Sequence, residues 1–353
     1  MPSSRTVLHR AAVAALTLGL VACSVPSDNS TAGGQPGNGG DGGAATGGQT
    51  GSSSGADGGE GGDGSKLVGI VSISANEGAN ARVIDGVTAA AEEQGWTVEV
   101  VDAAGDAAQA NAAITNFVSQ DAGMILDLVF PTSSLGAGLA AAQQAGIPVA
   151  TWGGGLGDGV VMTTGDGAPF AKPATEKLIE DTGGEAEVLA LTYRGGQVCR
   201  DREVLFDELM AEQPGISVTK EEVTIPGFLQ DGSRYATAWL AAHPEGSGNL
   251  AIWGCWEDPT LGAISALEQQ GRSDVLTYGI NGSSTAIQAV RDGSLTATVY
   301  EDSVTEGRTM FETTLEAIQA GDGWEPITVD VDGVLVTAET VEDFIAENPE
   351  TLE

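Results

Sequence analysis

From residue 66 onward, short runs of apolar, often β-branched residues alternate with longer segments in which apolar residues recur at helical spacing. The short runs predict buried strands, and the longer segments predict amphipathic helices. Segment 81–94, for example, carries Val83 and Val87 on one face and stops before Gly95, a common helix end. The predicted strands are 67–73, 98–102, 123–128, 147–152, 160–163, 188–193, 218–223, 250–253, 275–279 and 297–299. The predicted helices are 81–94, 107–119, 134–145, 169–181, 202–212, 234–242, 259–270, 284–292 and 304–320.

Strands separated by single helices imply parallel sheets with right-handed crossovers. About ten strands are too many for one regular open sheet and suit two lobes of five. Near the C-terminus, residues 330–333 have the composition of a hairpin turn. In doubly wound sheets, ligands bind beyond the carboxyl ends of the strands. We therefore expect an α/β protein whose two lobes direct those ends into one cleft.

Residues 1–22 have the pattern of a secretory leader. Arg5 and Arg10 precede a short apolar stretch, residues 11–20, which is too short to span a bilayer. Small residues then lead into Cys23, an arrangement that resembles the bacterial lipobox, in which the cysteine becomes the lipidated first residue. An ordinary leader with a chance cysteine is the alternative.

Residues 24–65 contain 16 glycines among 42 positions and no basic or aromatic residue. Such a segment cannot bury enough apolar surface to offset its ordering entropy. We expect residues 23–65 to be a lipidated cysteine followed by a disordered tether. This plan predicts an extracytoplasmic protein anchored by lipid to the cell membrane of a Gram-positive, high-GC organism.

The chain has 353 residues, with 50 acidic against 14 basic residues and a net charge of −36. That charge excludes a nucleic acid as partner and disfavours binding to an anionic membrane surface. Five acidic residues lie before residue 66, so 45 acidic and 12 basic residues belong to the body, whose charged surface favours solubility. His243 is the sole histidine after the leader, which argues against a His-rich metal site or a Ser-His-Asp triad.

Five short motifs, in order, resemble the type 1 periplasmic solute-binding proteins, specifically the ribose/sugar branch that serves ABC importers. The motifs are Asp85-Gly86, Ala145-Gly146-Ile147-Pro148-Val149, Thr260-Leu261-Gly262-Ala263, Tyr278-Gly279-Ile280-Asn281-Gly282 and Asp292-Gly293-Ser294-Leu295-Thr296-Ala297-Thr298-Val299. The resemblance covers residues 66–325 and implies the periplasmic-binding-protein type 1 fold, two doubly wound parallel-sheet lobes joined by three crossovers.

The resemblance also implies domain bounds. One lobe comprises 66–164 and 302–326, the other comprises 165–301, and a final crossover strand and helix occupy 327–353. The crossovers are expected near Thr164, Glu301 and Ile327. The two lobes would close on a small solute.

Three residues fall on the family's ligand-binding positions. Arg200 matches the arginine after the first strand of the second lobe, where its fork of donors suits hydroxyls or a carboxylate. Asn281 replaces the usual aspartate, and Glu301 stands where the family has a glutamine. The structural alternatives are a surface ion pair for Arg200, a turn residue for Asn281 and a solvated hinge charge for Glu301.

Elsewhere the chain departs from the family. The Asp-Arg pair after the fourth strand is Gly153-Gly154, an aromatic pair in the first loop is Ala79-Asn80, and Trp256 replaces an asparagine. Ring faces can compensate by stacking on a sugar, unless the rings serve only as core. The remaining candidate ligand-binding residues are Trp152, Trp256, Phe228, Asn76, Glu77, Asn80 and Asp127. Trp253 and Trp96 are expected in the core, away from the cleft, and the acidic excess favours a neutral or cationic solute.

Cys199 and Cys255 are the cysteines of the body, and each follows a strand of the second lobe. The two strands are expected to be neighbours in the doubly wound order, and the export signal implies an oxidising compartment. We expect a disulfide between them that fixes two cleft loops before binding. Two buried thiols are the alternative.

Catalytic patterns are weak, so no enzyme, cofactor or metal site is expected. The glycine-rich segment 153–159 follows the fourth strand, whereas a dinucleotide fingerprint belongs to the first strand-turn-helix unit. The leading hypothesis is a monomeric, lipid-anchored binding protein that delivers a sugar or polyol to an ABC-importer permease by hinge closure. The alternatives are a ligand-sensing receptor component, a binder of an amino or cationic compound, or an exported enzyme on this fold.

Overall fold

Two parallel sheets organise the residues that the computed structural model describes, 65–352. The predicted leader, Cys23 and the tether up to residue 64 lie outside this range. In spatial order, the first sheet consists of β11 (Ile327–Val329), β5 (Val160–Thr164), β4 (Val149–Trp152), β3 (Met124–Leu128), β1 (Leu67–Ser72) and β2 (Thr97–Asp102). The second consists of β12 (Val334–Thr337), β10 (Ala297–Tyr300), β9 (Val275–Asn281), β8 (Leu250–Gly254), β6 (Glu185–Thr192) and β7 (Gly215–Glu222).

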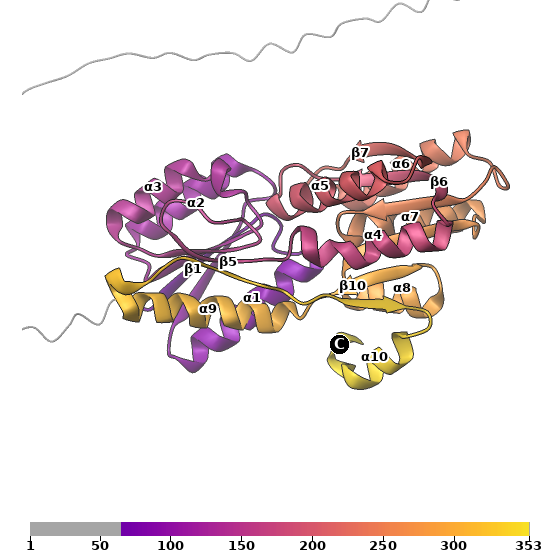
Figure 1. Cartoon of the computed structure of the whole chain (residues 1–353). Coiled ribbons are helices and arrows are strands. Elements are labelled where there is room, and N and C mark those ends of the chain that lie inside the picture. Colours follow the sequence, from indigo (N-terminus) through magenta and orange to yellow (C-terminus); the bar gives the residue numbers. More distant parts are fainter. Residues whose placement is uncertain (1–64, 353) are drawn as a thin grey trace, which may run out of the picture. The chain divides into compact units, whose positions relative to one another are not determined.

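Helices cover both faces of each sheet (Figure 1). Those of the first lobe are α1 (Gly78–Glu93), α2 (Ala107–Ser119), α3 (Gly136–Ala145) and α9 (Ser303–Ala320), with short 3₁₀ turns at Thr132–Ser134 and Gly321–Gly323. Those of the second are α4 (Ala168–Thr182), α5 (Gln197–Ala211), α6 (Phe228–Ala242), α7 (Glu257–Gln270), α8 (Ser284–Asp292) and α10 (Val341–Glu347), with a 3₁₀ turn at Pro349–Leu352. The predicted α/β architecture, two doubly wound lobes joined by three crossovers, is confirmed.

The C-terminal crossover differs from expectation. Strand β11 pairs in parallel with β5, whereas β12 pairs antiparallel with β10 in the other sheet. Each sheet in residues 65–352 therefore has six strands rather than five. Residues 330–333 are consequently the third connection between the lobes, and reading them as a hairpin turn was wrong. The first two connections follow Thr164 and Tyr300, close to their predicted places.

Several helices begin earlier than the apolar periodicity predicted. Helix α1 starts at Gly78 because the Glu77 side chain caps it, accepting hydrogen bonds from the backbone N–H groups of Ala79 and Asn80. Helices α5, α6 and α7 likewise start at Gln197, Phe228 and Glu257 rather than at 202, 234 and 259. Their first turns contain at most two apolar residues, beside polar ones or proline, so hydrophobic spacing alone does not reveal them. All of these early starts lie at the carboxyl ends of strands.

The cores match the predicted apolar positions. Trp253 is fully buried in β8 and packs on Phe206 with ring centroids 4.4 Å apart. Trp96 packs edge-on against Phe311, away from the strand ends that form the cleft.

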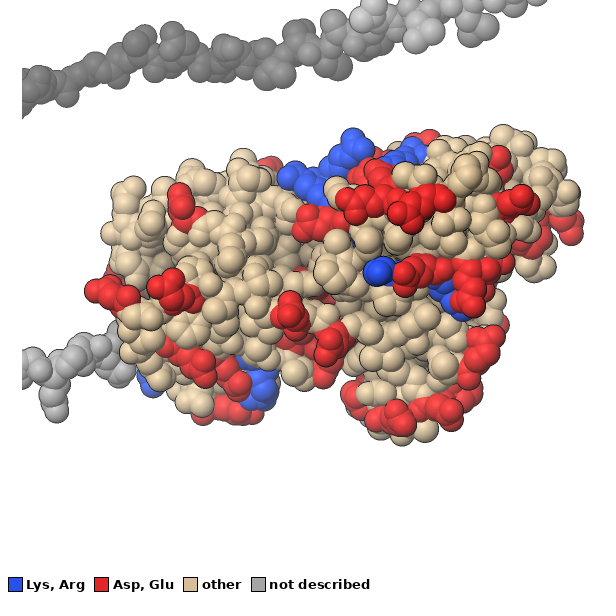
Figure 2. Space-filling model, viewed as in Figure 1, with Lys and Arg blue, Asp and Glu red and all other residues tan. Residues whose placement is uncertain are grey.

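Acidic side chains spread over the face of the body shown in Figure 2. Within residues 65–352, none of the helices combines the length and the apolar character needed to cross a membrane.

Candidate ligand-binding cleft

A cavity lies where the carboxyl ends of the two sheets face each other. Residues at or just beyond the ends of β1, β3 and β4 line it from one lobe, and residues at or just beyond the ends of β6, β7, β8 and β9 line it from the other. Its volume is about 40 Å³, well below the roughly 300–1,000 Å³ of ligand pockets. A solute of sugar size therefore enters only if the lobes separate or lining side chains move. The lining residues are Ile73, Ser74, Glu77, Asn80, Val129, Trp152, Tyr193, Val198, Cys199, Arg202, Ile225, Trp256 and Asn281.

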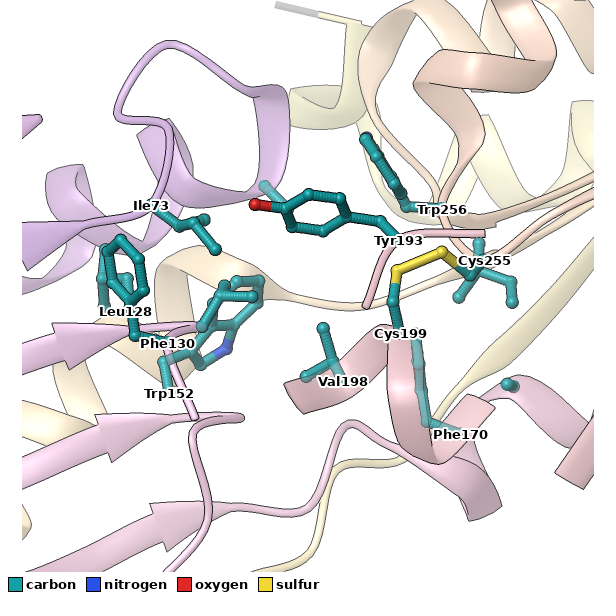
Figure 3. Packing of buried hydrophobic residues seen from close by; sticks show 14 of the residues in the cluster. Ile73, Leu128, Phe130, Trp152, Phe170, Tyr193, Val198, Cys199, Cys255 and Trp256 are labelled. Atoms are coloured by element: carbon teal, nitrogen blue, oxygen red, sulfur yellow. A yellow bond between two sulfur atoms is a disulfide. The ribbon is translucent and has the colours of Figure 1, made fainter. Parts of the chain in front are cut away.

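Aromatic rings form much of the cavity wall (Figure 3). Trp152 at the end of β4 and Trp256 after β8 both line it, where the sequence placed them. Tyr193, which was not among the predicted site residues, meets Trp256 edge-on at 6.0 Å between ring centroids. Phe228 is absent from the lining but packs edge-on against Trp256, with ring centroids 5.7 Å apart. Phe228 thus supports the wall and holds the orientation of Trp256.

Two polar atoms of the wall, Asn80 Oδ1 and Trp256 Nε1, are buried without a well-formed hydrogen bond among residues 65–352. Trp256 Nε1 does lie close enough to the Asp258 carboxyl to favour its ionised form, but the geometry falls short of a hydrogen bond. Asn80 Oδ1 is an acceptor and Trp256 Nε1 a donor, so a bound hydroxyl could satisfy either. Leaving such buried atoms unsatisfied costs about 1–3 kcal/mol each. The cavity wall therefore favours a polar occupant.

Arg202, rather than Arg200, reaches the cleft. Arg202 is 1% exposed; its guanidinium donates to the backbone oxygens of Asp166 and Cys255 and, at 2.8 Å, to Asn281 Oδ1. Both arginines lie in α5, and residues two apart on a helix face nearly opposite directions. Arg200, part-exposed outside the cavity lining, donates from Nε to the Arg194 carbonyl. The sequence pattern predicted a helix only from residue 202, which left Arg200 in a loop and favoured it over Arg202, the arginine that lines this wall.

Position 153 has no room for a side chain, which explains why glycine occupies it. A side chain there would place Cβ 2.2 Å from Val198 Cγ1 and 2.9 Å from the Asp166 carboxylate, and the backbone has φ of +64°. Both neighbours belong to the part of the chain beyond β5. The departure from the family's Asp-Arg pair therefore lets the strand end approach α5 closely.

Carboxyl groups gather on two sides of the cavity. On one side, Glu77, Glu257 and Asp258 have carboxylate oxygens within 4.8 Å of one another. Burial raises the pKa of Glu257 to about 7 and that of Asp258 to about 8, and the neighbouring Glu77 charge adds to both shifts. Arg82 lies nearby and donates to the Asn281 carbonyl, a hydrogen bond that joins the two lobes.

On the other side, Asp166, Glu301 and Glu306 form a similar group. Asp166 and Glu301 are completely buried, and burial raises the pKa of both carboxyls. Burial also raises the pKa of Glu306 to about 8. Trp152 Nε1 donates to Glu306 at 2.6 Å, which connects this group to the cavity wall.

The other predicted site residues lie near the cleft without lining the cavity. Asn76 is exposed beside Glu77, and Asp127 is completely buried in β3. Glu301 is buried in the second connection, not solvated as one alternative had it. Five of the ten selected residues line the cavity: Glu77, Asn80, Trp152, Trp256 and Asn281. Tyr193 and Asp166 were missed, although both follow strands, the rule that found Trp152 and Trp256.

The predicted Cys199–Cys255 disulfide is present in the structure. Strands β6 and β8 are neighbours, as expected, and the two Cα atoms lie 5.3 Å apart. The bond joins Cys199, in the first turn of α5, to Cys255, the residue before Trp256 (Figure 3). Arg202 lies one turn further along the same helix. The bond therefore fixes two parts of the cavity wall relative to each other.

Raising the pH from about 5 to about 8 is expected to destabilise the solute-free protein. The folded state keeps protons on Glu257, Asp258 and Glu306 that the unfolded chain, with carboxyl pKa values near 4, has already released. Unfolding then releases protons, so the free energy of unfolding falls as the pH rises through this window. Thermal unfolding across the window measures the slope. Glu306→Gln should flatten it, and a melting temperature that rises with pH would contradict this.

The chain matches the family model of the periplasmic binding protein domain over residues 68–322. It is 28% identical to the ribose import binding protein of Escherichia coli (strain K12) over 179 residues, 49% of this chain and 59% of that protein. The same figures hold for the Salmonella typhimurium protein. The chain thus spans about three fifths of the length of the curated relatives that it matches.

Solved structures agree with this match. An ABC transporter solute binding protein from Agrobacterium vitis with bound allitol has a TM-score of 0.73 and 25% identity, covering 80% of this chain and 99% of that one. A Bacillus halodurans solute binding protein with bound myo-inositol has a TM-score of 0.71 and 23% identity, covering 82% and 100%. These similarities show that the chain has the two-lobed fold of binding proteins rather than that of an enzyme.

Proposed function

Because the chain belongs to the periplasmic binding protein family, of the type 1 sugar-binding kind, we propose that it captures a small sugar or polyol and delivers it to the permease of an ABC importer. The family is extracytoplasmic and consists of solute-binding proteins. Capture would occur by closure of the two lobes about the three connections, with the solute contacting both lobes and so stabilising the closed form.

The cavity at the facing strand ends carries this proposal. Its aromatic walls suit the apolar faces of a sugar ring, and the unsatisfied Asn80 Oδ1 and Trp256 Nε1 suit hydroxyl groups. Within the proposal, Trp152 and Trp256 stack on the solute, and Asn80 and Asn281 contact its hydroxyls. Arg202 positions Asn281 through the 2.8 Å hydrogen bond between them.

The proposal includes lipidation of Cys23 and a tether through residue 65. The leader pattern and the glycine-rich composition support it. Such an anchor would keep the body near a membrane permease while the tether gives it reach.

A second candidate solute is an amine-bearing compound. The group of Glu77, Glu257 and Asp258 lies next to the ring of Trp256, and an ammonium group would be attracted by the carboxylates and by the ring face. Both candidate solutes would occupy the same cleft, so one screen compares them.

A thermal-shift screen of pentoses, hexoses, polyols and amino compounds tests the proposal. A true solute at 100 times its Kd should stabilise the protein by about 2.7 kcal/mol. Trp256→Ala should weaken binding at least tenfold, about 1.4 kcal/mol, because it removes one wall and the orphan donor. Trp324→Ala is the matched control, since Trp324 donates to the Val161 carbonyl at the opposite end of the sheet.

Stabilisation by amino compounds alone would favour the second candidate. Equal binding by the Trp256 and Trp324 variants would show that the solute does not occupy this cavity. Turnover of any bound compound would contradict a binding role.

A further inference from the structure

Three carboxyl groups converge where the lobes are joined. Asp166 lies in the first connection, Glu301 in the second, and Glu306 in the first turn of α9. One oxygen of each lies within 4.8 Å of one oxygen of each of the others. Residues far apart in sequence thus form one cluster at the hinge, and we refer to these three residues as the hinge carboxylates.

The hydrogen bonds of the hinge carboxylates leave their other oxygens free. Thr164 Oγ1 donates to Asp166 Oδ1 at 2.9 Å, and Trp152 Nε1 donates to Glu306 Oε2. Asp166 Oδ2, Glu306 Oε1 and both oxygens of Glu301 are buried and lack a partner within the described part of the chain. Glu301 is completely buried and directs a carboxyl oxygen into the cluster, where neither of its oxygens has a partner. A buried carboxyl in this state calls for a ligand, whatever the distances among the three groups.

The nearby positive charges do not neutralise this cluster. Arg202 directs its hydrogen bonds to two backbone oxygens and to Asn281 rather than to a hinge carboxylate. Arg82 contributes attraction, but it also lies near Glu257 and Asp258. When all three hinge carboxylates are ionised, the guanidinium of Arg202 leaves an excess of two negative charges, which equals the charge of one divalent cation. Binding of such an ion would displace the protons that burial otherwise keeps on these groups.

We propose that the hinge carboxylates form a binding site for a divalent cation of the calcium type. Calcium prefers oxygen ligands at about 2.3–2.6 Å, so ligands on opposite sides of the ion lie about 4.6–5.2 Å apart. The carboxylate oxygens of the hinge carboxylates lie within 4.8 Å of one another, close enough to share one such ion. Calcium accepts an irregular set of oxygen ligands of this kind, whereas magnesium demands a near-ideal octahedron. The ion would supply the partners that Glu301 lacks and would tie two connections to α9.

Calcium titration of the full chain, purified in a mild detergent, tests the site. Calcium chloride should raise the melting temperature saturably, and calorimetry should give one ion per chain. Glu301→Gln and Asp166→Asn should each weaken calcium binding at least tenfold. Two matched controls should bind calcium like the wild type. Glu316→Gln changes an exposed residue on α9, and Glu257→Gln changes one of the three acidic residues on the other side of the cavity.

Terbium gives a readout independent of stability. Because Trp152 donates directly to Glu306, excitation of tryptophan should sensitise emission from terbium at this site, and calcium should quench it by displacement. Trp152→Phe should reduce the emission while calorimetric binding persists.

The proposal is overturned if calcium up to about 10 mM, well above the weakest extracellular calcium sites, changes neither the melting temperature nor the heat signal. A melting temperature that depends on pH but not on calcium would show that protons, not a metal, fill the cluster. Loss of calcium binding in Glu257→Gln but not in Glu301→Gln would move the ion to the other side of the cavity and would equally overturn it.

Discussion

Removal of the Cys199–Cys255 disulfide is expected to lower the free energy of unfolding by about 4 kcal/mol. The bond closes a loop of 56 residues, and opening it restores conformational freedom to the unfolded chain. Both sulfurs lie in a buried part of the second lobe, so the cost is not offset by new hydration of the folded state. The loss should also weaken solute binding, because the bond fixes α5, which carries Arg202, relative to Trp256.

Denaturant unfolding of the Cys199→Ala/Cys255→Ala protein against the wild type measures this cost, with midpoint and slope read together. The wild type under reducing conditions should approach the variant, and the variant itself should not respond to reductant. A loss below about 1 kcal/mol would show that the bond does not restrict the unfolded chain as the entropy model requires. Unchanged solute affinity would remove its proposed role in the cleft.

The fold could be predicted from the sequence because its signals are local. Buried strands such as 67–73 and 250–253 are continuous apolar runs, and helix 107–119 has the predicted bounds. The sequence did not show that each sheet gains a sixth strand, β11 in the first and β12 in the second. Ile327–Val329 is a short edge strand, and its pairing with β5 depends on where the third connection crosses rather than on its own pattern.

The site was predicted only in part, for a geometric reason. The rule that ligands lie beyond strand ends found Trp152, Trp256 and Asn281, which line the cavity. It could not choose between Arg200 and Arg202, because that choice depends on whether α5 begins at residue 197 or at 202. A shift of five residues in a helix start changes which side chain is expected to face the cleft. The first turn of α5 adds only Val198 and Cys199 as apolar positions, too few for hydrophobic spacing to mark the start.

The electrostatic character of the cleft was also beyond sequence reasoning. Glu301 was weighed between a ligand contact and a solvated hinge charge, yet it is completely buried beside Asp166. This environment depends on burial and on contact with Asp166, which is more than 100 positions away in the chain. The sequence next to Glu301 shows neither. The same holds for Arg202, whose partners come from three different segments.

Replacement of Arg202 by methionine is expected to lower the free energy of unfolding by about 3–5 kcal/mol, the usual cost of breaking a buried charge network. The side chain is 1% exposed, and its loss would leave the Cys255 carbonyl and Asn281 Oδ1 without their donor. Its positive charge also lowers the pKa of Asp166 and Glu301 against the effect of burial. Without it, those carboxyls should titrate at still higher pH.

Arg200→Met is the matched control, two residues earlier on the same helix and part-exposed, and its cost should stay within about 0.5 kcal/mol. Arg202→Lys should recover only part of the loss, because an ammonium keeps the charge without the guanidinium fork.

Denaturant unfolding at about pH 5 and about pH 8 separates the hydrogen-bond contribution of Arg202 from its charge contribution. The hydrogen-bond contribution should persist at both values, whereas the charge contribution should be larger at the higher pH, where more hinge carboxylates are ionised. Equal losses for the Arg200 and Arg202 variants, or a loss for Arg202→Met that does not change with pH, would show that Arg202 does not hold this network together.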